Sequence, residues 1–119
     1  MSRRQLRILA LIAVATLGTL LLAGCGDSSS ASEPVQTNQV NLPPSYKFEP
    51  KVIQVTAGTT VTWTNNDHFT HSVEFEGQPD RQLKPGESVE VTFDTPGTYD
   101  YKCTLHPHDM SGTVVVVSN

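Results

Sequence analysis

Short runs in which every second residue is apolar, separated by turn signals, make up the chain from residue 41 to residue 119. The paired apolar positions are Ile53 and Val55, Val61 and Trp63, Val73 and Phe75, Val89, Val91 and Phe93, and Tyr99 and Tyr101. A period of two places such residues on one face of a strand, and Ala-Gly or Pro-Gly steps turn the chain between strands. The sequence therefore predicts an all-β fold, a two-sheet antiparallel Greek-key sandwich of about seven to eight strands.

The predicted domain, residues 41–119, has about 80 residues, which is enough for one small hydrophobic core. Tyr99 follows a Pro-Gly turn and is placed to form the corner that ties one sheet to the next. Residues 25–40 are mostly polar, as in the stretch GDSSSASEPVQTNQV. Such a composition does not bury enough apolar surface to fold, so we expect a flexible tether there.

The first residues have the parts of an export signal, with arginines at Arg3, Arg4 and Arg7 followed by the apolar run ILALIAVATLGTLLLAGC. The stretch LLAGC, which ends at Cys25, resembles the bacterial lipoprotein processing box. That resemblance implies a signal peptide at residues 1–24 and a lipid on Cys25. The protein would then be exported and lipid-anchored to the bacterial membrane on its extracytoplasmic side, in the periplasm or at the cell surface. The alternatives are a plain signal peptide with an incidental cysteine and an uncleaved anchor.

Removal of the signal makes the chain more acidic. The three arginines leave, so 5 of the 8 Lys and Arg residues remain against 12 Asp and Glu residues, a net charge of −7. Charge therefore gives no reason to expect binding to nucleic acid or to anionic lipid, and membrane attachment depends on the lipid at Cys25. With Cys25 lipidated, Cys103 has no partner for a disulfide. An unpaired thiol in an exported protein needs a function.

The segment CTLHPHDM, residues 103–110, holds several metal donors between two predicted strands. Cys103, His106 and Met110 lie in this loop, and His71 begins another strand. If the two strand ends meet at one end of the sandwich, two imidazoles, a thiolate and a thioether come together. These are the donors of an electron-transfer copper site. The alternatives are that Cys103 is a buried apolar residue and that Met110 only packs in the core.

Two further histidines, His68 and His108, are expected to be solvated loop residues. The alternative is that they form an outer metal site or a capture point for copper together with Asp67 and Asp109.

The sequence resembles the cupredoxin family, the small blue copper proteins that include plastocyanin, pseudoazurin and amicyanin. The likeness runs from about Tyr46 to Val117 and is carried by FEPKVIQVTAGTTVTWTNNDHFTHSV and PGTYDYKCTLHPHDMSGTVVV. It implies one mononuclear copper ion. The ligands that it implies are His71, Cys103, His106 and Met110. Seven steps separate the cysteine from the methionine, whereas plastocyanin-like loops place the methionine further along and amicyanin-like loops nearer.

The resemblance also suggests which groups surround the ligands. The backbone N–H of Ser72 would point at the sulfur of Cys103, and such hydrogen bonds shift the reduction potential. Asn65 and Asn66 would brace the loop beneath the metal. Pro107, which has no N–H group, would stiffen the ligand loop.

We expect a blue-copper electron-transfer protein that shuttles one electron between redox partner proteins, with the electron passing through the edge of His106. It would be a monomer, it would bind no small-molecule substrate, and it would not be an enzyme. The alternative function is copper binding for delivery, storage or resistance, which the exposed histidines keep open. A sandwich without a metal ranks third. Zinc would fit a Cys-His-His site but would do no redox work.

Overall fold

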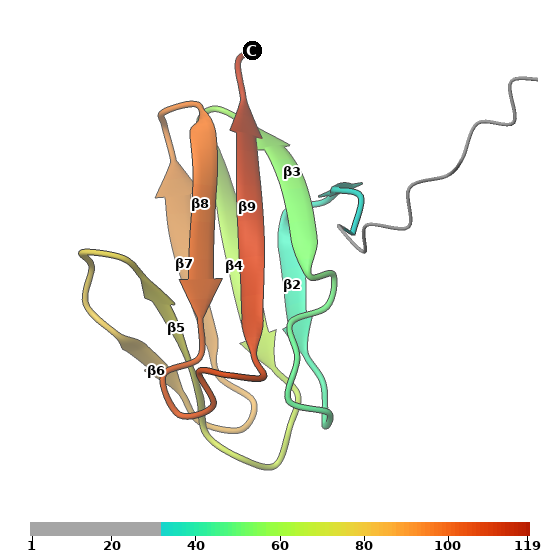
Figure 1. Cartoon of the computed structure of the whole chain (residues 1–119), viewed down its shortest axis with the longest axis vertical. Helices are drawn as coiled ribbons and strands as arrows, with labels where there is room; N and C mark the ends of the chain where they lie inside the picture. The colour runs from blue at the N-terminus through green and yellow to red at the C-terminus, as the bar shows by residue number, and fades with distance from the viewer. Residues whose placement is uncertain (1–31) are drawn as a thin grey trace, which may run out of the picture.

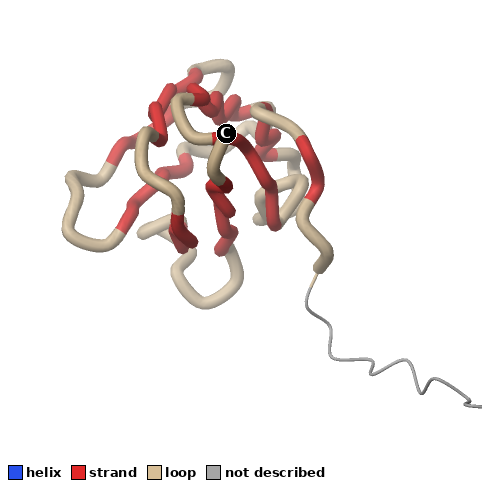
Figure 2. Tube along the Cα trace, turned by 90° about the horizontal axis from the view of Figure 1, so that it is seen from above, coloured by secondary structure: helices blue, strands red, loops and turns tan. Residues whose placement is uncertain are grey.

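The computed structural model describes residues 32–119, which form two β-sheets packed face to face (Figure 1). The six-stranded sheet contains, in spatial order, β1 (Val35–Gln36), β3 (Val52–Thr56), β9 (Ser111–Val117), β8 (Gly97–Lys102), β5 (His71–Phe75) and β6 (Arg81–Leu83). The three-stranded sheet contains β2 (Gln39–Leu42), β4 (Thr59–Asn65) and β7 (Ser88–Phe93). Only strands and loops occur within the described part of the chain (Figure 2). Residues 32–119 include no helix long and apolar enough to cross a membrane.

The predicted all-β sandwich of two sheets is confirmed, but within residues 32–119 its sheets are mixed and have nine strands rather than seven or eight. The pairs β4–β7, β5–β6, β5–β8 and β8–β9 are antiparallel, as predicted. The pairs β1–β3, β2–β4 and β3–β9 are parallel. Alternating apolar residues show which face of a strand is buried, but they do not show in which direction its neighbour runs.

The N-terminal boundary of the domain also differs from the prediction. Part of the segment assigned to a tether forms β1 and the start of β2. Val40 and Leu42 alternate on one face of β2, pair with Trp63 and Asn65 of β4, and are almost fully buried. The domain therefore begins before residue 41, because two apolar residues at strand spacing are enough to extend an existing sheet. The predicted signal peptide and Cys25 lie outside the described residues.

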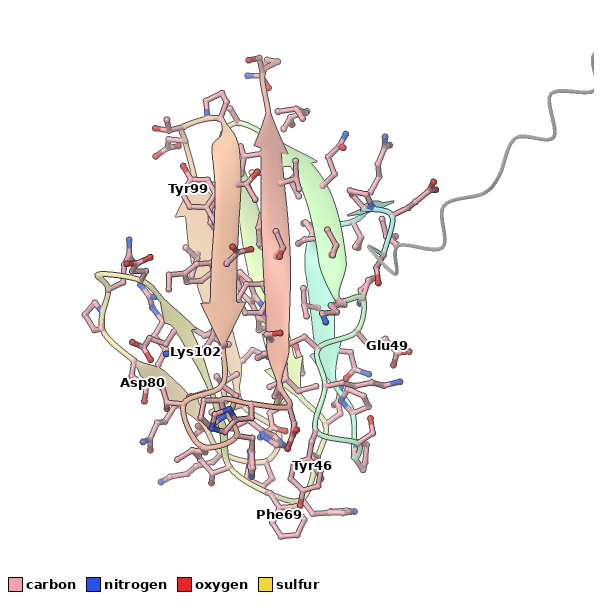
Figure 3. All side chains as sticks on the ribbon, in the orientation of Figure 1. Tyr46, Glu49, Phe69, Asp80, Tyr99 and Lys102 are labelled. Atoms are coloured by element: carbon pink, nitrogen blue, oxygen red, sulfur yellow. The ribbon has the colours of Figure 1, made fainter. Side chains whose placement is uncertain are left out.

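The core lies between the two sheets and is rich in aromatic rings. Trp63 is fully buried, and its ring centroid lies 5.3 Å from that of Tyr101 and 5.8 Å from that of Phe75. At the end shown uppermost in Figure 3, the hydroxyl of Tyr99 donates a 2.7 Å hydrogen bond to the carbonyl oxygen of Thr95. Since the chain passes from β7 to β8 at this corner, the predicted role of Tyr99 in joining the two sheets is confirmed.

Four loops meet at the opposite end of the sandwich, which we call the site end. They are residues 43–51 between β2 and β3, residues 66–70 between β4 and β5, residues 84–87 between β6 and β7, and residues 103–110 between β8 and β9 (Figure 1). The strands β5 and β8 are antiparallel neighbours, so the start of β5 and the end of β8 lie together at this end. This arrangement brings His71 close to Cys103.

Candidate metal centre

Three side chains converge at the site end: His71 at the start of β5, Cys103 directly after β8, and His106 in the following loop. Their ligand atoms all lie within 4.8 Å of one another. The sulfur of Cys103 is 3.9 Å from Nδ1 of His71 and 3.7 Å from Nδ1 of His106. Nitrogen and sulfur donors bound to one ion at roughly 2.0 and 2.3 Å are separated by about 3.5–4 Å. The three donors therefore have the spacing that a single metal ion requires.

The donors differ in their access to solvent. His71 and Cys103 are fully buried, whereas His106 is half-buried. Within residues 32–119, these three form the one group of three or more His, Cys, Asp or Glu side chains close enough to share an ion. The cysteine side chain and one imidazole are closed off from solvent, so His106 is the donor nearest the surface.

The ligand loop folds back on itself through backbone hydrogen bonds. The N–H of Cys103 donates to the carbonyl oxygen of Met110 at 3.0 Å, and the N–H of Met110 donates to the carbonyl oxygen of His106 at 3.0 Å. Met110 is fully buried and belongs to the same core cluster as Cys103. The loop closure therefore holds Met110 beside the other three residues, and its role as a ligand stays a prediction.

The predicted hydrogen bond to the cysteine sulfur is confirmed. The backbone N–H of Ser72 donates to Sγ of Cys103 at 3.3 Å. The side chain of Ser72 also joins the two ligand segments, because its Oγ accepts a 2.8 Å hydrogen bond from the backbone N–H of Thr104. The position of the sulfur is thus fixed from β5 as well as from its own loop.

The loop at residues 66–70 is braced by the two asparagines that the sequence singled out. Asn65 is fully buried, and its Nδ2 donates to the carbonyl oxygens of Phe69 at 2.8 Å and Leu83 at 2.9 Å. The backbone N–H of Asn66 donates to the carbonyl oxygen of Leu42 at 3.0 Å. The predicted bracing is confirmed, since these bonds tie the loop to β2 and β6.

Asp67 contacts the candidate ligand His71 and does not form the outer metal site that the sequence left as an alternative. It is buried, and its Oδ2 lies 2.8 Å from Nε2 of His71, on the side of the ring away from Cys103. The hydrogen bond with His71 holds the pKa of the Asp67 carboxyl below its ordinary value. The other members of that hypothetical site, His68, His108 and Asp109, are exposed. The spacing of Asp67 four residues before His71 was the available signal, but it is also common in ordinary loops.

An aromatic cover over the site was not predicted. The ring of Tyr46, from the loop after β2, has its centroid 4.7 Å from that of His106 and 6.2 Å from that of Phe69 (Figure 3). Tyr46, Phe69 and Leu105 are exposed large apolar residues, with Phe69 the most exposed at 58%. Half-buried His106 therefore lies within an apolar surface. No sequence pattern indicates this surface, since turn residues such as Tyr46 show no periodicity.

Comparisons with known proteins agree with this geometry. A family model described as a cupredoxin-like domain matches residues 10–116. Amicyanin-alpha from Methylorubrum extorquens is 33% identical over 95% of this chain and 98% of that protein. Plastocyanin from Scenedesmus fuscus is 39% identical over 58% of this chain and 85% of that protein. The structure of a purple cupredoxin from Nitrosopumilus maritimus is 28% identical, with a TM-score of 0.62, and the match covers 66% of this chain and 98% of that one.

Proposed function

This chain belongs to the cupredoxin family, and on that premise we propose that it binds one mononuclear copper ion and carries single electrons between redox partner proteins. The proposed ligands are His71, Cys103, His106 and Met110. The observation that carries the proposal is the convergence of two imidazole nitrogens on one buried thiol at the end of the sandwich. Two imidazoles, one thiolate and a weak thioether are the donor set of blue-copper electron-transfer sites.

The copper ion, when bound, supplies a couple between Cu(I) and Cu(II). The protein holds its donors in place before and after the electron moves. The Ser72 N–H bond fixes the sulfur, and the asparagine braces fix the loop beneath His71. Because these contacts are already formed without the metal, little protein movement is needed when its charge changes. Small reorganisation favours rapid electron transfer.

His106 is the proposed point of electron entry and exit. It is half-buried, whereas His71 and Cys103 are fully buried. Tyr46 packs against the ring of His106 and stacks on Phe69, and these two exposed side chains, with exposed Leu105 next to His106 in the chain, offer a surface for transient protein contact. The proposal therefore assigns the protein a partner and no substrate, with no bond made or broken at the site.

Export and a lipid on Cys25 complete the proposal. They rest on the sequence of residues 1–25, and they would place the domain on the extracytoplasmic side of a bacterial membrane. There the tethered domain would meet other membrane-attached or exported redox proteins.

A visible absorption spectrum of the full chain in detergent with added Cu(II) tests the proposal. We expect an intense thiolate-to-copper band that a mild reductant bleaches. The band should be lost in Cys103→Ser and retained in His108→Ala, a matched change at an exposed histidine of the same loop. A pale wild-type solution whose weak bands survive unchanged in Cys103→Ser would contradict electron transfer and favour the alternative, copper binding for delivery or storage through histidines without the thiolate.

A further inference from the structure

The imidazole of His71 is held from both sides. Its Nδ1 faces the sulfur of Cys103 at 3.9 Å, and its Nε2 lies 2.8 Å from Oδ2 of Asp67. A carboxylate accepts hydrogen bonds and does not donate them, so the ring proton is on Nε2. Nδ1 then keeps a free electron pair directed toward the site. The contact with Asp67 therefore selects the tautomer of His71 that can bind a metal.

Asp67 is itself fixed in position. Its Oδ1 accepts a 2.6 Å hydrogen bond from the backbone N–H of His68, and its own N–H donates to Oδ1 of Asn65 at 2.9 Å. Asn65 is in turn fully buried and bonded to Leu83 in β6. Both carboxylate oxygens thus have partners, and the side chain cannot rotate without breaking them.

The carboxylate is also a buried charge without a basic counter-ion. Asp67 is 4% exposed, and in the described residues neither Lys nor Arg forms an ion pair with it. Charges interact more strongly where water is excluded than they do at the surface. A negative charge on the far side of the ligand ring therefore acts on any ion bound at Nδ1, and it favours the ion of higher charge.

We propose that Asp67 is a positioning residue of the metal centre: it holds His71 with Nδ1 toward the site, and its charge lowers the reduction potential by stabilising Cu(II) relative to Cu(I). This inference rests on the proposed function. The electron that reduces the site comes from a reduced partner protein, and it leaves to an oxidised one. Asp67 gains and loses no electron, and acts through its hydrogen bond to His71 and through its charge.

Two variants separate the charge of Asp67 from its hydrogen bond. Asp67→Asn removes the charge and keeps one oxygen to accept the Nε2–H bond, while its NH2 group replaces the oxygen that accepts from the backbone N–H of His68. Asp67→Ala removes both. Asp109→Asn is the matched control, since it removes the same charge from an exposed position in the ligand loop. All are compared with wild type as full chains in detergent.

The first measurement is a redox titration of the copper-loaded proteins. We expect the midpoint potential of Asp67→Asn to shift upward, by more than that of Asp109→Asn, with the thiolate band kept. Asp67→Ala should also bind copper about 10–100-fold more weakly, as is typical when the hydrogen-bond partner of a ligating histidine is lost. An unchanged potential in Asp67→Asn, or a shift no larger than that of Asp109→Asn, overturns the proposal that the charge of Asp67 lowers the reduction potential.

The second measurement does not depend on copper. Nitrogen-15 NMR of the metal-free protein reports which ring nitrogen of His71 carries the proton. We expect Nε2–H in wild type and Asp67→Asn, and a mixture of tautomers in Asp67→Ala. A single Nε2–H tautomer in Asp67→Ala overturns the positioning role. A wild-type chain without a bleachable thiolate band overturns both the proposed function and the redox part of this inference. A normal band in wild type, with the same reduction potential in wild type and Asp67→Asn, overturns the redox part of the inference and leaves the proposed function standing.

Discussion

The backbone N–H of Ser72 donates a 3.3 Å hydrogen bond to the sulfur of Cys103, and so connects the start of β5 to the loop after β8. The two strands pair antiparallel through Glu74 with Lys102 and Phe75 with Tyr101. The bond to the sulfur continues that contact beyond the last ladder pair. The metal centre is therefore built on two neighbouring strands of one sheet, and the cysteine does not depend on its loop alone.

The Ser72 hydroxyl should matter for stability and not for the reduction potential. The hydroxyl of Thr104 donates to the carboxylate of Asp80 at 3.1 Å, so it accepts from the Ser72 hydroxyl, 2.8 Å away. The Ser72 hydroxyl proton is then not available to the cysteine sulfur, which lies 3.8 Å away. Ser72→Ala leaves the backbone N–H in place but removes the partner of the Thr104 N–H. We expect the free energy of unfolding to fall by about 1–2 kcal/mol.

Urea unfolding of the copper-free protein measures this loss, and a redox titration of the loaded protein measures the potential. Ser88→Ala is a suitable control, because its hydroxyl bonds Thr64 in an exposed position. A potential shift in Ser72→Ala as large as that in Asp67→Asn would show that the hydroxyl bonds the sulfur after all.

The candidate ligands could be predicted because they lie at a strand end and in one short loop, where the path of the chain restricts the positions of their side chains. Cys103, His106 and Met110 lie within one short loop between two strands. His71 opens a strand, and strand ends gather at the ends of a sandwich. The Ser72 contact was implied by the resemblance to the cupredoxin family. The convergence of His71, Cys103 and His106 was thus predictable from spacing, and the ligand role of Met110 stays a prediction.

Contacts between loops could not be predicted in the same way. Asp67 and Tyr46 reach the site from loops whose shapes depend on side-chain hydrogen bonds and on neighbouring strands. The parallel pairs β2–β4 and β3–β9 were missed because apolar alternation is the same for parallel and antiparallel neighbours. Val40 was placed in a tether because a short strand at the edge of a polar segment has too few residues to show a period.

Replacement of Met110 tests its untested role as the weak axial ligand. Met110→Leu conserves volume in a fully buried position, so we expect the copper-free protein to lose no more than about 1.5 kcal/mol of unfolding free energy. The loaded protein should show a higher reduction potential, because loss of a thioether donor disfavours Cu(II) more than Cu(I). Redox titration checks this. An unchanged potential and absorption spectrum would make Met110 a packing residue only.

Tyr101 should make the fold sensitive to alkali. Its hydroxyl has no hydrogen-bond partner among the described residues, and burial raises the pKa of the phenol above its ordinary value of 10.0. The unfolded chain therefore releases this proton at a lower pH than the folded chain does. The free energy of unfolding is not reduced by Tyr101 below about pH 10. It falls as the pH rises beyond that value, because ionisation of the Tyr101 phenol favours the unfolded state.

Tyr101→Phe should remove this part of the pH dependence. Urea unfolding of the copper-free protein from about pH 9 to 11 should show a smaller loss of stability in the variant than in wild type. At neutral pH we expect little change, since removal of an unpartnered buried hydroxyl is close to neutral. Equal slopes for the two proteins above pH 10 would show that Tyr101 is not protected from ionisation.

Gly112 should be required for the packing of β8 against β9. It pairs with Tyr101, and a Cβ atom at this position would collide with the Tyr101 hydroxyl and lie 2.9 Å from the carbonyl oxygen of Lys51. Gly112→Ala should therefore lower the unfolding free energy by about 1–3 kcal/mol, the usual cost of overpacking. In combination with Tyr101→Phe the loss should be smaller, because the phenol oxygen is gone, but not zero, because the ring carbon that carried it and the Lys51 carbonyl oxygen still occupy the space of the methyl group. Urea unfolding of the four proteins in a double-mutant cycle measures the coupling, and additive effects would mean that these remaining atoms, and not the hydroxyl, exclude the methyl group.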